Sequence, residues 1–207
     1  MRPLASIAPA LLCLLLALSA RSAVAQKSGK PLPVVTGEAR AVAMTQQITD
    51  RLRIAQDWHW HKGEYRHIVA LSRMIAVSDP HDIENYSQAA WLLWSMDEDN
   101  DAVAMYKQGI AANPQTYYMY DDLGYYYYNR KKDMANAALY LQKAIEMPDC
   151  QARSFHTLAH VYEKLGDLRK ARDTWARAAE MPNNPTRPAA KVNLERVTRL
   201  LKEKGGH

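Results

Sequence analysis

The chain has 207 residues, of which 48% are hydrophobic, and its formal net charge is +5 at pH 7. This length is sufficient for one domain with a core of its own. A net charge this small does not favour a nucleic-acid partner, which a strongly basic face would attract. Loss of residues 1–25 would leave +3, because Arg2 and Arg21 lie within that segment.

The N-terminus has the pattern of a secretory signal peptide. Arg2 precedes an apolar run over residues 4–18, and Ala-Val-Ala at 23–25 supplies the small residues that a signal peptidase reads. The run has about 15 residues, fewer than the roughly 20 that cross a bilayer as a helix. We therefore predict cleavage after Ala25, a periplasmic or secreted product, and no membrane insertion after cleavage.

Two further features of the N-terminal segment bear on its processing. Lipid attachment at Cys13 is the less favoured alternative to cleavage after Ala25, because Leu12 precedes the cysteine and apolar sequence follows it. Residues 26–37 contain two glycines and two prolines, which are typical of a flexible leader.

A fixed period of 34 residues runs through the rest of the chain. It is marked by four prolines, Pro80, Pro114, Pro148 and Pro182. Small or compact residues recur in two further series, each stepping by 34, 35 and 34: Ile68, Ala102, Ala137 and Ala171, and then Ile75, Gly109, Ala144 and Ala178. Such a period is typical of helical-repeat solenoids. We expect the one extra residue in a loop at 130–133, because loops absorb insertions.

The residues between the prolines carry a family resemblance. The third repeat has Tyr120, Leu123-Gly124, Tyr127, Ala137, Leu141, Ala144 and Pro148, and the fourth has Phe155, Leu158-Ala159, Tyr162, Gly166, Ala171, Trp175 and Ala178. With this pattern the chain resembles the tetratricopeptide repeat family. The second repeat matches less well, and the first, with Gln56 and His59 in its first helix, departs most.

The resemblance implies an all-α solenoid of about four helix-turn-helix repeats with a C-terminal capping helix. We predict a solenoid over 38–204, and the boundaries of its parts are listed together: repeats at about 49–82, 83–116, 117–151 and 152–185, and a capping helix over 186–204. Because a residue before proline avoids the helical region, Asn113 and Met147 should lie at or past helix ends. Gly166-Asp167 indicates a helix stop followed by an N-cap.

The resemblance also implies a binding groove, lined by one stripe of the first helix of each repeat. The sixteen stripe residues are Asp50, Arg53, Asp57 and Trp60; Glu84, Ser87, Trp91 and Trp94; Tyr118, Asp121, Tyr125 and Tyr128; and Arg153, His156, His160 and Glu163. Six of them are Trp or Tyr, the residue types that supply rigid contact area at binding hot spots. We therefore predict a non-catalytic interaction module that binds a peptide or protein segment, whereas a core-packing role of the rings is the alternative.

A second hypothesis of function rests on histidines. His156, His160 and Glu163 project from one face of a helix and could converge on a metal or another small ligand such as a glycan, although a solvated helix face explains them as well. In the run Trp58-His59-Trp60-His61 the side chains diverge around a helix, so a shared ligand set is not expected there.

The sequence contains no motif of a catalytic site: no Gly-rich phosphate loop, no Gly-x-Ser-x-Gly and no Cys-x-x-Cys. The acidic run at 97–101 imitates half of a calcium loop, but Ala102 stands where glycine is needed and Gln108 where glutamate is needed. We predict neither an enzyme nor a bound cofactor. For Cys150, the only cysteine after residue 25, a buried thiol is favoured over an intermolecular disulfide.

Overall fold

The computed structural model describes residues 37–182 and 184–205. The predicted signal peptide and the predicted leader, except Gly37, lie outside the described residues. The chain divides into two units, Met1–Val42 and Ala43–His207. The described part of the first unit is the beginning of one helix, and the repeats belong to the second unit.

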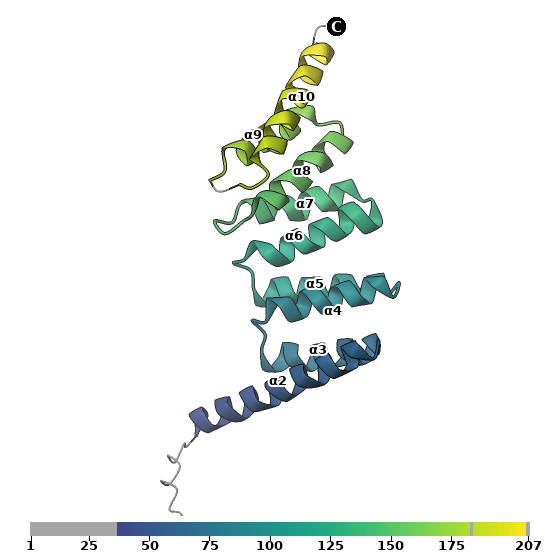
Figure 1. Cartoon of the computed structure of the whole chain (residues 1–207), viewed down its shortest axis with the longest axis vertical. Coiled ribbons are helices and arrows are strands. Elements are labelled where there is room, and N and C mark those ends of the chain that lie inside the picture. The colour runs from purple at the N-terminus through teal and green to yellow at the C-terminus, as the bar shows by residue number, and fades with distance from the viewer. Residues whose placement is uncertain (1–36, 183, 206–207) are drawn as a thin grey trace, which may run out of the picture. The chain divides into compact units, whose positions relative to one another are not determined.

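All regular elements in the described residues are helices, so the predicted all-α fold is confirmed (Figure 1). The elements are α2 (Glu38–His61), α3 (Tyr65–Ser78), α4 (Ile83–Ser95), α5 (Asp99–Ala112), α6 (Tyr117–Tyr126), the π-helix η1 (Tyr127–Lys131), α7 (Met134–Ile145), α8 (Ala152–Lys164), α9 (Leu168–Glu180) and α10 (Arg187–Gly205). From α3 onward, each helix packs against the next one in the chain. None of these helices combines the length and the hydropathy of a membrane-spanning segment.

Aspartates begin three of the helices. The carboxylates of Asp82, Asp133 and Asp167 each accept a hydrogen bond at 3.0 Å from the backbone N–H three residues further on, which satisfies one of the free donors at a helix start. The two predicted helix ends are also confirmed, since Asn113 is the C-cap of α5 and Met147 follows the end of α7.

Each repeat turns between its two helices through one residue in the left-handed conformation. These residues are Gly63, Asp97, Lys132 and Gly166, with φ between 55° and 79°. After Gly63 and Gly166 the next N–H reaches back to a carbonyl five residues earlier, which is the Schellman ending of a helix. Glycine suits this position because an L side chain is strained there.

The extra residue of the third repeat is not in a loop. Instead, the end of its first helix widens into the π-helix η1, in which each turn holds one more residue than an α-helical turn. The turn residue Lys132 therefore keeps its place relative to the second helix. The prediction of a loop at 130–133 was wrong because a helix end can absorb an insertion as well as a loop can.

The compact residues of the two repeat series lie inside the stack of helices. All eight are buried. A Cβ added to Gly109 would lie 2.6 Å from the sulfur of Met119, and one added to Gly124 would lie 2.6 Å from Cγ of Leu141. Because real atoms do not approach so closely, these positions require small side chains, as the period predicted.

The first repeat is packed differently from the others. In the middle of its first helix it has Gln56, where the other repeats have Ala90, Gly124 and Ala159. The large Ile68 also replaces the alanine of the other repeats, and α2 and α3 lack the close backbone approach of the other three helix pairs. Larger side chains at the contact positions hold the two helices apart.

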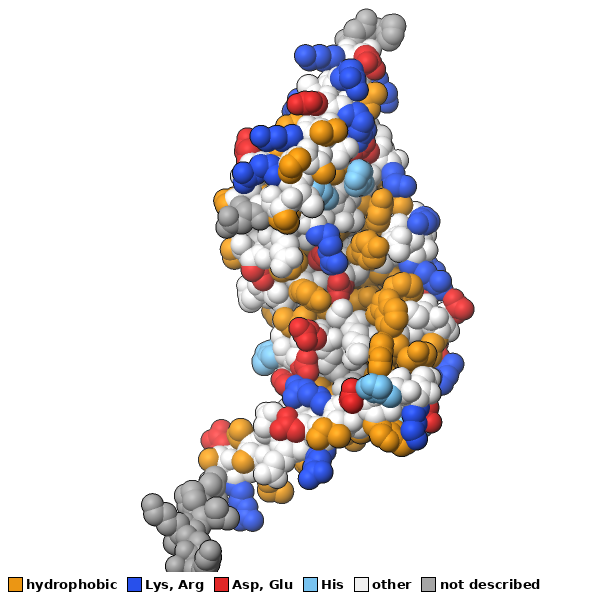
Figure 2. Space-filling model, viewed as in Figure 1, with side chains coloured by type: hydrophobic (Ala, Val, Ile, Leu, Met, Phe, Trp, Pro, Cys, Tyr) orange, Lys and Arg blue, Asp and Glu red, His pale blue; other side chains and the backbone are white. Residues whose placement is uncertain are grey.

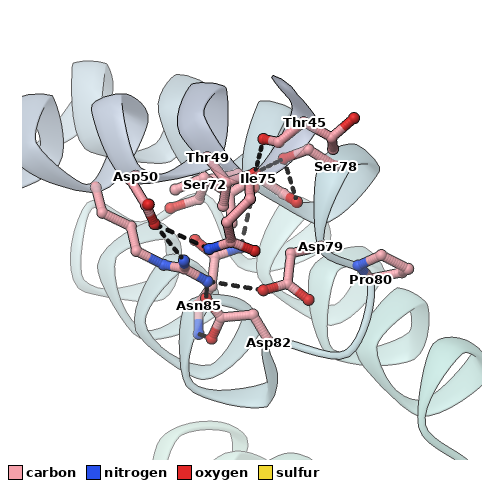
Figure 3. Close-up of polar contacts among 12 residues, drawn as sticks. Thr45, Thr49, Asp50, Ser72, Ile75, Ser78, Asp79, Pro80, Asp82 and Asn85 are labelled. Atoms are coloured by element: carbon pink, nitrogen blue, oxygen red, sulfur yellow. Dashed lines mark hydrogen bonds and ion pairs between the residues drawn. The ribbon is translucent and has the colours of Figure 1, made fainter. Parts of the chain in front are cut away.

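Polar side chains bridge the wider space between α2, α3 and α4 (Figure 3). The amide nitrogen of Gln56 donates to Ser72 at 2.7 Å and to Asn85 at 3.3 Å. The guanidinium of Arg53 donates to Asp79 and Asp82 at 2.8 Å each. The first repeat is therefore joined largely by hydrogen bonds, and the later repeats by apolar contact.

Candidate functional site

A groove with a volume of 710 Å³ lies along the second unit, lined by residues of α2, α4, α5, α6, η1 and α8. The helix α4 supplies six lining residues; besides Asn85, five of them lie on one face of the helix because of their spacing. These five are Glu84, Ser87, Gln88, Trp91 and Trp94. In the view of Figure 2, hydrophobic side chains gather over the middle of the stack with acidic and basic side chains among them.

Aromatic rings run from the mouth of the groove into the core. Trp91 is 46% exposed and meets Trp94 edge-on, with ring centroids 6.2 Å apart. Trp94 in turn lies 6.4 Å from the buried ring of Tyr126. On the facing helix α6, Tyr118 and Tyr125 are 37% and 41% exposed. The outer rings thus offer apolar area to a ligand, and the inner rings fix their positions.

The arginines of the groove are held by carboxylates of neighbouring repeats. Arg153 pairs with Asp121 and lies 5.9 Å from the ring centre of Tyr125. Arg130 pairs with Asp97 and lies 5.9 Å from the ring centre of Trp94. Each guanidinium thus has a carboxylate partner and lies beside an exposed or half-buried ring, an arrangement that favours a preorganised groove.

One carboxyl group in the groove has an unusual environment. Burial raises the pKa of Asp122, and the hydroxyl of Ser87, which donates to it, partly offsets this effect. The guanidinium of Arg153 lies 3.5 Å from its other oxygen. Asp122 therefore links α4, α6 and α8 at the floor of the groove.

Eight of the sixteen predicted stripe residues line the groove: Arg53, Glu84, Ser87, Trp91, Trp94, Tyr118, Tyr125 and Arg153. Asp57 and Trp60 line a smaller adjoining hollow of 320 Å³, which shares Arg53, Gln56 and Gln88 with the groove. Neither placement shows that a ligand binds there, so the binding role of these residues stays a prediction.

Two predicted groove residues point elsewhere. Asp121 is almost fully buried beneath Arg153, so it orients that arginine and does not face a ligand. Tyr128 packs on the core of the C-terminal repeats, and the ammonium of Lys164 lies 5.5 Å from its ring centre. Tyr128 turns away from the groove because η1 is a π-helix with a wider turn than an α-helix. Asn129, four residues after Tyr125, lines the groove in its place.

Three further predicted residues, His156, His160 and Glu163, form a separate cluster around Trp175. The rings of His156 and His160 each lie 4.9 Å from the ring of Trp175. The carboxylate of Glu163 accepts a hydrogen bond from Trp175 at 2.9 Å, and Arg196 of α10 binds both of its oxygens at 2.7–2.8 Å. The charge of the Glu163 carboxylate is thus balanced by Arg196. Burial lowers the pKa of both histidines. The cluster ties α8 and α9 to α10.

Several lining residues were not predicted from the sequence: Asp82, Asp122, Asn129 and Arg130. Asp82 is the N-cap residue of α4. The other three are not at the predicted stripe positions, since Asp122 follows one of them in α6 and Asn129 and Arg130 lie in η1. Cys150, by contrast, is a buried free thiol, and burial raises its pKa to about 11.

Comparison with known proteins supports the fold. The tetratricopeptide repeat family profile matches residues 152–184, whereas no curated protein matches the sequence. Among solved structures, MamA is similar with a TM-score of 0.52 and 17% identity over 73% of this chain and 97% of that chain. The pilF protein of Pseudomonas aeruginosa has a TM-score of 0.57 and 15% identity, covering 77% of this chain and 71% of that one.

A third similar structure is YrrB, described as a TPR protein with an unusual peptide-binding site. Its TM-score is 0.56 and its identity 15%, over 79% of this chain and 82% of that chain. These three proteins share the paired-helix fold with this chain, but their sequences are only 15–17% identical to it. Residues 152–184 therefore form a tetratricopeptide repeat, and the helices of the second unit have the fold of tetratricopeptide-repeat proteins.

Proposed function

We propose that this chain is a non-catalytic interaction module of the cell envelope, which binds a peptide or protein segment in the groove between α4 and α6. The observation that supports it most is the exposure of Trp91, Tyr118 and Tyr125 around one ordered cavity. Exposed rings at fixed positions are the usual anchors of a protein interface. The fold itself is one that generally serves protein interaction.

The chemistry of the groove favours an extended segment with apolar or aromatic side chains. The exposed rings supply apolar contact, while the paired arginines leave little unbalanced positive charge for an acidic ligand. A volume of 710 Å³ is within the range of ligand pockets and accommodates a few residues of a peptide. The description of YrrB as having a peptide-binding site agrees with such a ligand.

Mutations at the rings test the groove. We expect peptides selected from a random displayed library against the purified protein to lose about fivefold or more in affinity with Trp91→Ala or Tyr125→Ala, since hot-spot rings contribute about 1 kcal/mol or more. Trp58→Ala is the matched control, because Trp58 is 53% exposed but does not line the groove. Equal affinities of all three variants would place binding elsewhere.

The natural partner can be captured in the cell that makes the protein. A photo-crosslinking amino acid at position 125 should give a specific adduct, whereas the same group at Leu139, which is 49% exposed and lies on α7, should not. The same adduct from both positions would contradict the proposal.

The envelope location rests on Arg2, the apolar run at 4–18 and the Ala-Val-Ala at 23–25. N-terminal sequencing of the protein from a cell fraction checks it. We expect the mature protein to begin at Gln26 and to be found in the periplasm or medium. A chain that still begins at Met1 in the cytoplasm would refute the location without affecting the groove.

A further inference from the structure

We propose that His59, Glu64 and His67 form a zinc site at the turn between α2 and α3. Among the His, Cys, Asp and Glu side chains of the described residues, this is the one group of three whose potential ligand atoms all lie within 4.8 Å of one another. Nδ1 of His59 is 2.6 Å from a carboxylate oxygen of Glu64. The rings of His59 and His67 are stacked, with centroids 4.7 Å apart and planes within 9°.

The backbone of the turn creates this proximity. Gly63 has φ +69°, and the N–H of Glu64 donates to the carbonyl of His59 at 3.0 Å. This Schellman ending folds the chain back, so that Glu64 lies beside the last turn of α2. The N–H of His67 donates to the carbonyl of Glu64 at 3.0 Å, which fixes the first turn of α3 in the same place. The three side chains are thus brought together by an ordered turn.

The set of side chains suits zinc. Two imidazoles and one carboxylate supply nitrogen and oxygen ligands of the types that bind Zn²⁺, and a tetrahedral ion would keep its fourth position for water. Tetrahedral ligands at about 2.1 Å from the ion are roughly 3.4 Å apart, so the ligand atoms of His59 and Glu64, now 2.6 Å apart, would separate and the widest pair would close by about 1.4 Å. One of the two stacked imidazoles would also rotate, because each nitrogen lone pair lies in the plane of its own ring. The ion would occupy the position between His59 and Glu64 that a hydrogen bond now bridges.

The charge of the ligands favours a cation as well. Glu64 supplies a carboxylate, whose negative charge attracts a divalent cation. The ammonium of Lys62 lies 3.4 Å from the ring centre of Trp58. Glu64 and His59 are half-buried and His67 is exposed, so an ion can reach the site from solvent.

The position of the site gives it a structural role. The helices α2 and α3 lack close backbone approach, and the site lies at the turn that joins them. A metal ion here would join the end of α2 to the start of α3 in the repeat that lacks close apolar packing. This role is independent of ligand binding in the groove.

Other histidines are less suitable. His61, in the same last turn of α2 as His59, directs its Nδ1 to the carbonyl of Asp57 at 2.8 Å. His156 and His160 flank Trp175, and the nearby carboxylate of Glu163 is bound by Arg196. These residues therefore provide controls for the proposed site.

The test uses the full chain, freed of metal by dialysis against EDTA, with Zn²⁺ as the only added ligand. Calorimetry should show one ion bound per chain, and the melting temperature should rise with zinc concentration, because the ion binds the native state. His67→Ala and Glu64→Gln should each weaken zinc binding at least tenfold, whereas His61→Ala should leave it unchanged. Circular dichroism of the metal-free variants checks that each one folds.

Replacement of zinc by Co²⁺ gives a second measurement. We expect the visible absorption of a tetrahedral cobalt site in the wild-type protein, and its loss in His67→Ala. Three outcomes would overturn the proposal: no zinc bound by the wild-type chain, undiminished binding in both His67→Ala and Glu64→Gln, or equal weakening by His61→Ala.

Discussion

The bond between Trp175 and Glu163 is the clearest place to test how the C-terminal helices are held together. Glu163 of α8 accepts from the fully buried indole of Trp175 on α9 and from Arg196 on α10. Glu163→Ala removes the acceptor of one buried donor and the counter-charge of one guanidinium. Glu163→Gln keeps an acceptor for the indole but removes the charge.

The two substitutions should differ in magnitude. An indole N–H left unpaired in the core costs about 1–3 kcal/mol. The side chain of Arg196 is 36% exposed, so water replaces most of its lost partner, and this part costs about 0–1 kcal/mol. We expect Glu163→Ala to destabilise the protein by about 2–3 kcal/mol and Glu163→Gln by about 1 kcal/mol or less. For a domain of this size, the first value corresponds to a fall of about 4–12 °C in melting temperature.

Denaturant melts followed by Trp fluorescence measure both variants, and hydrogen exchange locates the loss. Because repeats interact mainly with their neighbours, faster exchange should be confined to α8, α9 and α10. Equal destabilisation by the two substitutions, or a loss below about 0.5 kcal/mol for Glu163→Ala, would show that the buried hydrogen bond is not what holds these helices.

Two more predictions follow from buried positions. Ala171→Leu should overpack the contact between α8 and α9 and lower the free energy of unfolding by about 1–3 kcal/mol, as measured in a denaturant melt. The control Arg169→Leu, on the exposed side of α9, should change the free energy of unfolding by less than about 0.5 kcal/mol. A neutral Ala171→Leu would refute the register of the repeat. Since burial raises the pKa of Cys150 to about 11, the native thiol should react with a disulfide reagent at pH 8 at least 100-fold more slowly than the unfolded chain, and comparable rates would contradict a buried thiol.

The fold could be predicted from the sequence because its determinants are local. Small residues such as Ala102 and Gly109 recur at the contact points of each helix pair, and prolines mark the segments between repeats. These signals need no knowledge of distant contacts. The left-handed turn residues follow the same period, although only Gly63 and Gly166 show it in their residue type.

The site could be predicted only in part. The four predicted residues of α4 line the groove together, since that helix is regular and residues at this spacing share one face. Tyr128 does not line the groove, and this could not be foreseen because nothing in the sequence distinguishes a π-helical turn from a loop insertion. The burial of Asp121 depends on Arg153, which lies 32 residues away in the next repeat. A periodic pattern indicates which face a residue occupies but not which side chain covers it.

The hydrogen bonds that Arg53 and Gln56 of α2 make with the following helices bear on the order of folding. Repeat proteins nucleate where neighbouring units are most strongly coupled, and the fold then spreads outward. The apolar cores that involve α4 to α10 meet this condition, whereas α2 buries Thr49 but exposes Ile48 and Ile54. On a ribosome α2 is synthesised before every other helix described here, yet it has the least reason to become ordered first. We therefore expect α2 to dock after α3 and α4 have formed the surface that receives it, so that the first helix to be made would be the last to fold.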